Sequence, residues 1–251
     1  RWHGEMPPLT TYHALFDVLR QREFVGNFLE LGGGYSTVLA RTLFDDEKVN
    51  ITSVDFYPAK YLQILNSKKN SQNFLKNIDS INKVTVSFDE VEKALVEVID
   101  RLLSFDLLSL RESILKFVSA DSSADEISAL IDKKDRQGIY REITEHMGFV
   151  NEIPFYENSD AMSGEGACRH IANSGIAIDA VFLDCGEASS LAEFVALEGS
   201  LKSGSYVLLH DIYFPKSIKN FLLAALFTLS PEWEVIYQDK VSEQGGVVAV
   251  K

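Results

Sequence analysis

A chain of 251 residues with 46% hydrophobic and 24% charged residues has the composition of an ordinary globular protein with a substantial core. Its 37 acidic residues outnumber 24 basic ones, and the net charge of −13 argues against a nucleic-acid or anionic-membrane partner. No apolar run reaches the roughly 20 residues of a membrane span, and no secretory signal pattern is present at the start. The two cysteines, Cys168 and Cys185, form no disulfide framework, so a cytoplasmic location is expected.

The beginning of the chain predicts a helix, a strand, a second helix and a second strand. Residues 1–25 form an N-terminal helical segment in which apolar side chains recur at helical spacing. The apolar run 28–31 predicts a buried strand, 36–43 a helix, and 51–54 a second short strand. An alternation of strand and helix therefore starts here.

Residues 59–149 show a different pattern, dominated by long stretches of helical period. Apolar residues recur at this period over 91–102 and 107–117, and Ser87 with Glu90 suits the start of a helix. A flexible linker would lack such periodicity. We therefore expect a mostly helical insertion that acts as a lid or as an oligomerisation element.

The alternation of strand and helix resumes after the insertion. Strands are predicted at 153–156, 177–183 and 206–209, helices at 163–172, 190–201 and 218–229, and final strands at 233–237 and 247–250. Strands that are apolar throughout indicate a parallel sheet buried on both faces. The pattern predicts an α/β fold with a doubly wound, mostly parallel sheet, in which the last two strands could pair as a hairpin.

The sequence Glu-Leu-Gly-Gly-Gly at 30–34 marks a tight turn between the first strand and the helix that follows. Glycine tolerates positive φ and lets the backbone approach a nucleotide-like ligand. A dinucleotide fingerprint needs G-x-G-x-x-G, but Thr37 stands at the third glycine position. This residue disfavours a nicotinamide-dependent oxidoreductase, while the glycines alone do not name the ligand.

Acidic residues follow the predicted strands at the edge where α/β sheets bind ligands. They are Glu30, Asp55, Asp160, Asp184 and Asp211, with His210 beside the last. An acid after nearly every predicted strand indicates a ligand site rather than a chance feature of an acidic chain.

The glycine turn, together with Glu30 before it, resembles motif I of the class I S-adenosylmethionine (SAM)-dependent methyltransferases. The segments 179–184 (Asp-Ala-Val-Phe-Leu-Asp) and 201–211 (Leu-Lys-Ser-Gly-Ser, ending in His-Asp) give a second match. They are similar to small-molecule O-methyltransferases, including relatives of the sugar and macrolide methyltransferases. The chain departs from this pattern at Cys185, where glycine is usual, and at Glu187, near the position of a frequent histidine.

The resemblance implies a Rossmann-like methyltransferase fold with a doubly wound, seven-stranded, mostly parallel sheet and a C-terminal antiparallel hairpin. It assigns residues 26–58 and 150–251 to a SAM-binding domain, interrupted by the insertion at 59–149. Selectivity for a small-molecule acceptor would then lie in this insertion and in the N-terminal segment, where Trp2, His3 and Tyr12 could line the acceptor pocket.

The resemblance also implies which residues bind the cofactor: Glu30, Gly32, Gly33, Gly34, Ser36, Asp55, Asp160, Met162 and Asp184. Gly32 and Gly34 would let the backbone approach the amino-acid end and the sulfonium of SAM. Asp55 would accept hydrogen bonds from the ribose hydroxyls. Asp160 would lie near the adenine amino group, with Met162 packed against the adenine face.

The implied reaction is methyl transfer to an oxygen of a small molecule, with His210, Asp184 and Asp211 as catalytic residues. His210 is the expected general base because the unperturbed pKa of histidine lies near neutrality. In catechol-type relatives, acids at these two strand ends bind Mg²⁺, so Asp184 and Asp211 are also candidate metal ligands. Ile212, which follows Asp211, cannot act as a ligand, so His210 or Glu187 would have to complete such a set.

Two further interpretations stay open. The departures at Cys185 and Ile212, together with the large insertion, would suit a binding or scaffold protein that keeps the SAM fold without the reaction. The helical insertion could also hold two copies of the chain together as a homo-oligomer.

Overall fold

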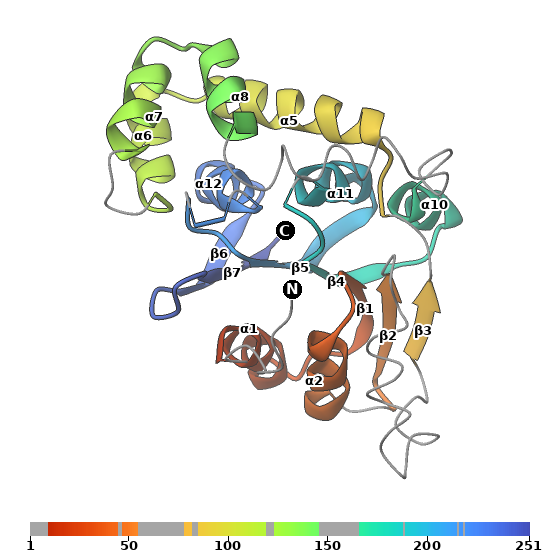
Figure 1. The fold of residues 1–251 in the computed structure, drawn as a ribbon. Helices are drawn as coiled ribbons and strands as arrows, with labels where there is room; N and C mark the ends of the chain where they lie inside the picture. The colour runs from red at the N-terminus through yellow and green to blue at the C-terminus, as the bar shows by residue number, and fades with distance from the viewer. Residues whose placement is uncertain are drawn as a thin grey trace, which may run out of the picture.

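The structure is a computed structural model that describes residues 10–44, 47–54, 78–81, 85–118, 123–145, 166–187, 189–214, 216–217 and 219–251. They form an α/β fold in which helices cover both faces of a central mixed sheet (Figure 1). The predicted α/β class is confirmed. No helix among the described residues is long and apolar enough to cross a membrane.

The described residues contribute seven strands to one sheet, in the order β3-β2-β1-β4-β5-β7-β6. The strands are β1 (Gly26–Leu31), β2 (Val49–Val54), β3 (Ile78–Ile81), β4 (Ile178–Leu183), β5 (Leu201–His210), β6 (Glu234–Asp239) and β7 (Gly246–Val250). Strands β1 to β5 pair in parallel, whereas β7 is antiparallel to both β5 and β6. Strands β2 and β3 follow β1 on one side of it, whereas β4 lies on the other side of β1 and is followed by β5 in that direction. The strand order therefore reverses between β1 and β4.

The helices lie in layers on the two faces of this sheet (Figure 1). They are α1 (Thr10–Gln21), α2 (Tyr35–Leu43), α5 (Phe88–Leu103), α6 (Leu107–Leu115), α7 (Ser123–Asp132), α8 (Arg136–Glu145), α10 (Ala167–Ser174), α11 (Ser189–Leu197) and α12 (Phe221–Leu229). Helices α1 and α2 cover one face, and α10, α11 and α12 cover the other. Helices α5 to α8 form an outer layer over α11 and α12.

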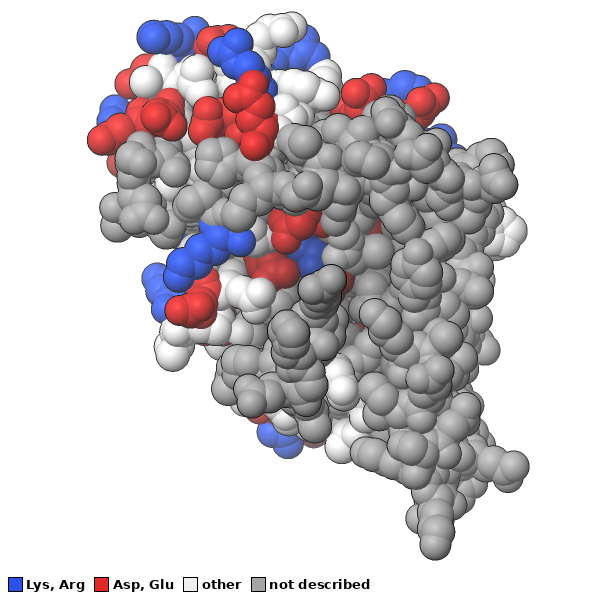
Figure 2. Space-filling view, viewed as in Figure 1, with Lys and Arg blue, Asp and Glu red and all other residues white. Residues whose placement is uncertain are grey.

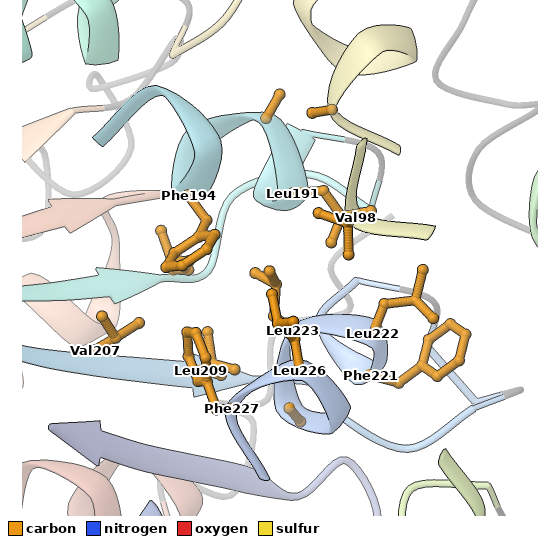
Figure 3. Close-up of a cluster of buried hydrophobic side chains, with 14 of the residues drawn as sticks. Val98, Leu191, Phe194, Val207, Leu209, Phe221, Leu222, Leu223, Leu226 and Phe227 are labelled. Carbon is orange, nitrogen blue, oxygen red and sulfur yellow. The ribbon is translucent and has the colours of Figure 1, made fainter. Parts of the chain in front are cut away.

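Each face of the sheet has its own buried cluster. On the α1 and α2 side, Phe16, Phe28 and Phe44 pack ring against ring, with centroids 5.4 to 5.9 Å apart. On the opposite side, Figure 3 shows side chains of α5, α11 and α12 meeting those of β5, among them Phe194 and Leu209. Burial on both faces explains why the central strands are apolar throughout.

Helix α12 explains why the outer helices are needed. Its sequence is apolar on all sides, and every residue from Phe221 to Phe227 is buried. Such a helix needs cover on the side that faces away from the sheet. Helices α5 and α6 supply it, since their apolar side chains belong to the same cluster and the Ser113 hydroxyl donates to the Ala225 carbonyl at 2.9 Å. On the outside of this layer, acidic and basic side chains are intermixed (Figure 2).

The predicted elements differ from the structure at a few places. Helix α5 begins after Ser87, whose backbone N–H and hydroxyl both donate to the Glu90 carboxylate, as the sequence indicates. Strand β3 lies inside the range expected to be mostly helical, and its four residues, two of them polar, are too short a pattern to reveal a strand. The strand predicted at 153–156 lies outside the described residues.

Candidate functional site

The glycine turn and Asp184 lie side by side where β1 and β4 end. Gly32 follows β1 with φ +94, in the left-handed region, and a side chain there would clash with the Asp184 carbonyl. The backbone of Asp184 donates to the Leu31 carbonyl at 2.9 Å. Because the strand order reverses here, this is the edge position where open α/β sheets bind ligands.

Gly34 leaves space at the entrance to α2. Its φ of 178 is extended, so no backbone strain demands glycine at this position. A Cβ placed there would meet no atom within 4 Å. The absence of a side chain therefore keeps free the space beside the first turn of α2, where backbone N–H groups point outward.

Thr37 ties this turn to the buried acid behind it. Its hydroxyl donates to Glu30 Oε2 at 2.5 Å and accepts from the backbone N–H of Gly34 at 3.0 Å. The residue that breaks the dinucleotide fingerprint thus has a structural role of its own: it joins the acid at the end of β1 to the glycine turn.

Glu30 is fully buried, and none of the described residues places a cation beside it. Burial raises the pKa of its carboxyl to about 7, while hydrogen bonds from the hydroxyls of Ser36, Thr37 and Ser53 oppose the rise. Its Oε1 atom has no hydrogen-bond partner among the described residues. An orphaned acceptor behind a glycine turn can receive a hydrogen bond from a ligand.

Four charged side chains meet at the ends of β4 and β5. Lys219 Nζ donates to Asp184 Oδ1 at 2.7 Å and to Asp211 Oδ2 at 3.2 Å. His210 Nδ1 lies 3.1 Å from the same Asp184 oxygen and 3.2 Å from Asp211 Oδ1. All four side chains are 10% exposed or less, so two carboxylates and two cations balance one another out of water.

The charges in this cluster set each other's pKa. Burial opposes the charged form of Asp184, but Lys219 and His210 hold the pKa of its carboxyl well below its usual range. Burial also opposes protonation of His210, yet its hydrogen bonds to Asp184 and Asp211 raise its pKa to about 9. The two carboxylates therefore favour the imidazolium form of His210.

Two uncharged groups complete the cluster. The Tyr12 hydroxyl, which reaches in from α1, donates to Asp184 Oδ2 at 2.8 Å, and its ring lies against that of His210 at 4.6 Å between centroids. The Asn220 amide donates to the carbonyls of Leu183 at 3.2 Å and His210 at 2.6 Å. These contacts hold the last residues of β4 and β5 together.

Cys185 lies in a separate polar cluster behind the site. Thr85 donates to Glu193 Oε1 at 2.5 Å and lies 3.9 Å from the Cys185 sulfur. Burial, with Glu193 nearby, raises the pKa of the Cys185 thiol, and burial also raises the pKa of the Glu193 carboxyl. These surroundings disfavour the thiolate form of Cys185, which is the nucleophilic form of cysteine.

The structure places the predicted site residues in two neighbouring groups. Glu30, Gly32, Gly33, Gly34 and Ser36 lie at the turn between β1 and α2, and Asp184, His210 and Asp211 lie at the ends of β4 and β5. Asp55, Asp160 and Met162 lie outside the described residues.

Sequence reasoning missed Thr37 as the link to Glu30, and it missed Lys219 and Asn220 altogether. Thr37 could have been suspected, since it lies one helical turn after Gly34 and a hydroxyl there can bond the turn. Lys219 carried no comparable signal, because only the fold of 211–220 brings it back to the strand ends.

No family model matches the sequence, and no curated protein is similar to it. Solved structures that match include an O-methyltransferase from Bacillus cereus in complex with SAH, at 12% identity and a TM-score of 0.47 over 98% of this chain and 82% of that one. Another is the O-methyltransferase TomG from Streptomyces achromogenes, involved in tomaymycin synthesis and solved with SAM, at 9% identity and a TM-score of 0.47 over 98% and 81%. Likeness at this level does not assign an activity, which has to be drawn from the residues of this chain.

Proposed function

We propose that this chain is a SAM-dependent methyltransferase that transfers a methyl group to an oxygen of a small-molecule acceptor. The observation that carries the proposal is the glycine turn at the strand-order reversal, with space beside Gly34 and the orphaned Glu30 oxygen behind it. The resemblance to motif I supplies the identity of the ligand. The antiparallel pairing of β7 with β5 and β6 supports the seven-stranded sheet and C-terminal hairpin that the resemblance implies.

The turn offers groups that fit the amino-acid end of SAM. An ammonium group could donate to Glu30 Oε1, and a carboxylate could accept from the backbone N–H groups at the start of α2. We assign Gly32, Gly33, Gly34 and Ser36 to this end of the cofactor. Asp55, Asp160 and Met162 keep their proposed contacts with the ribose and adenine.

SAM supplies an activated methyl group, so the protein has to position the acceptor oxygen and move its proton. Asp184, His210 and Asp211 are the proposed catalytic residues because they adjoin the glycine turn. His210 must lose its own proton before it can accept another, since its pKa is raised to about 9. If it is the general base, the rate rises with pH until about that value.

The residues do not fit Mg²⁺ as they stand. The Lys219 ammonium contacts both Asp184 and Asp211, the two carboxylates that the resemblance offers as ligands. We assign no step of the reaction to a metal. We also propose that acceptor selection lies with the N-terminal segment, since Tyr12 of α1 reaches the cluster.

Calorimetric titration with S-adenosylhomocysteine tests the cofactor. The wild-type protein should bind it, and Gly34→Val should weaken binding at least tenfold because the new side chain fills the open space. Gly199→Val is the matched control, since a Cβ at Gly199 also meets no atom within 4 Å but lies after α11. No binding by the wild type, or equal binding by the two variants, would remove the cofactor assignment.

A SAM-binding protein without methyl transfer is the second candidate. The ion network favours it, because the His210 Nδ1 atom is already engaged by the carboxylates of Asp184 and Asp211. A screen of hydroxylated small molecules for S-adenosylhomocysteine release separates the two. Release that is lost in His210→Gln supports the enzyme, whereas cofactor binding with no release for any acceptor supports the silent protein.

A further inference from the structure

The pair Asp184 and Asp211 has the donor chemistry of a divalent metal site. One ligand atom each from Asp184, His210 and Asp211 lies within 4.8 Å of the others. Hard cations such as Mg²⁺ take carboxylate oxygens at about 2.0–2.1 Å and keep several waters. A metal bridging these two carboxylates would therefore sit in the gap between Asp184 and Asp211.

That gap is where the Lys219 ammonium lies. Nζ donates to Asp184 Oδ1 at 2.7 Å and to Asp211 Oδ2 at 3.2 Å, and the lysine is only 6% exposed. A lysine ammonium is a compact point charge, so it can occupy the position of an ion between two oxygens.

The Lys219 ammonium also places a positive charge beside both carboxylates. Buried charges are stable when they are paired, and Lys219 is paired with Asp184 and with Asp211. The second oxygen of Asp184 accepts from Tyr12. A dication in the same gap would have to sit against the Lys219 ammonium.

Asn220 follows Lys219 in the chain, and its Oδ1 is buried without a hydrogen-bond partner among the described residues. Its amide nitrogen is fixed by hydrogen bonds to the carbonyls of Leu183 and His210. Ile212 itself is buried and apolar.

We propose that Lys219 is a built-in cation that replaces a divalent metal between Asp184 and Asp211, and that removing its ammonium opens a divalent-cation site. Lys219 is a positioning residue: it holds the two carboxylates at the ends of β4 and β5 in one arrangement. The proposal does not depend on the proposed function, since it concerns binding of a metal alone.

Binding of Mn²⁺, followed by the loss of its free-ion paramagnetic resonance signal and by calorimetry, tests the proposal on the full chain. Wild type, Lys219→Ala, and Lys219→Ala combined with Asp211→Asn are compared, with the exposed Lys202→Ala as the control. Lys219→Ala should bind one Mn²⁺ at least tenfold more tightly than the wild type and Lys202→Ala, and adding Asp211→Asn should abolish this site. Mn²⁺ should raise the melting temperature of Lys219→Ala alone.

Saturable Mn²⁺ binding by the wild type that is lost on Asp211→Asn would overturn the proposal. So would a folded Lys219→Ala protein that gains no Mn²⁺ affinity. If Lys219→Ala does not fold, Lys219→Gln serves instead, because it removes the charge but keeps a polar side chain of similar reach. Failure of this experiment would leave the titration with S-adenosylhomocysteine unaffected, so the two proposals fail separately.

Discussion

Glu30 and Asp184 are buried acids at the ends of neighbouring parallel strands, yet their surroundings shift their pKa values in opposite directions. Glu30 is surrounded by hydroxyl groups, and burial raises its pKa to about 7. Burial acts on Asp184 in the same direction, but Lys219 and His210 lower its pKa below the usual range. Burial alone therefore does not decide whether an acid is charged, because a paired cation outweighs it.

Glu30 and Asp184 also differ in their capacity to accept a hydrogen bond from a ligand. Glu30 keeps one oxygen without a hydrogen-bond partner among the described residues, so a ligand can add a bond. Both oxygens of Asp184 already accept hydrogen bonds, from Lys219 and from Tyr12. The carboxylate of Asp184 therefore has less capacity for a further hydrogen bond than the carboxylate of Glu30.

Removing the carboxylate of Asp184 should have the largest effect on stability. Asp184→Ala leaves the buried charges of Lys219 and His210 with only Asp211 between them, and breaking a buried pair costs about 3–5 kcal/mol. Urea unfolding measures the change. Asp17→Ala is the control, since the exposed pair of Asp17 with Arg20 at 2.8 Å should contribute less than about 1 kcal/mol. Similar losses in both variants would show that the cluster is not a paired, dry network.

His210 should make stability fall in alkaline solution. Its pKa is raised from 6.5 to about 9, so its contribution is complete below about pH 6.5 and is lost as the pH rises through 9. The loss should be about 3 kcal/mol, since one pKa unit corresponds to about 1.4 kcal/mol. Unfolding measured from pH 6 to 10 should show this slope in the wild type and not in His210→Gln. A His210 ring signal that titrates below pH 7 by NMR would contradict the ion network.

The raised pKa of Glu30 should also make stability fall with rising pH, but over a lower pH range than that of His210. The pKa of Glu30 is raised from 4.5 to about 7, so the folded state binds the proton more tightly and stability falls as the pH rises between these values. The fall should be about 2–3 kcal/mol between pH 5 and 7.5. Glu30→Gln has no charge to bury and should lack this slope, whereas the exposed Glu112→Gln should keep it. A wild type that is equally stable at both pH values would mean that Glu30 has a cation partner.

The sequence by itself indicated most strands of the sheet, though not β3, and the position of the glycine turn. Apolar runs revealed β1, β2, β4, β5 and β7, because a strand buried on both faces has to be apolar along its length. Three glycines after an acid revealed the turn, because Gly32 needs a conformation and a closeness to Asp184 that no other residue allows.

Only the tertiary structure decided the charges at the site. The sequence predicts His210 as a neutral base and Asp184 with Asp211 as metal ligands. The sequence could not indicate that Lys219 contacts both carboxylates. This contact depends on the left-handed backbone at Asp211, with φ 59, and on the chain that folds back after it. A pKa or a bound cation depends on neighbours in space, and sequence spacing does not supply them.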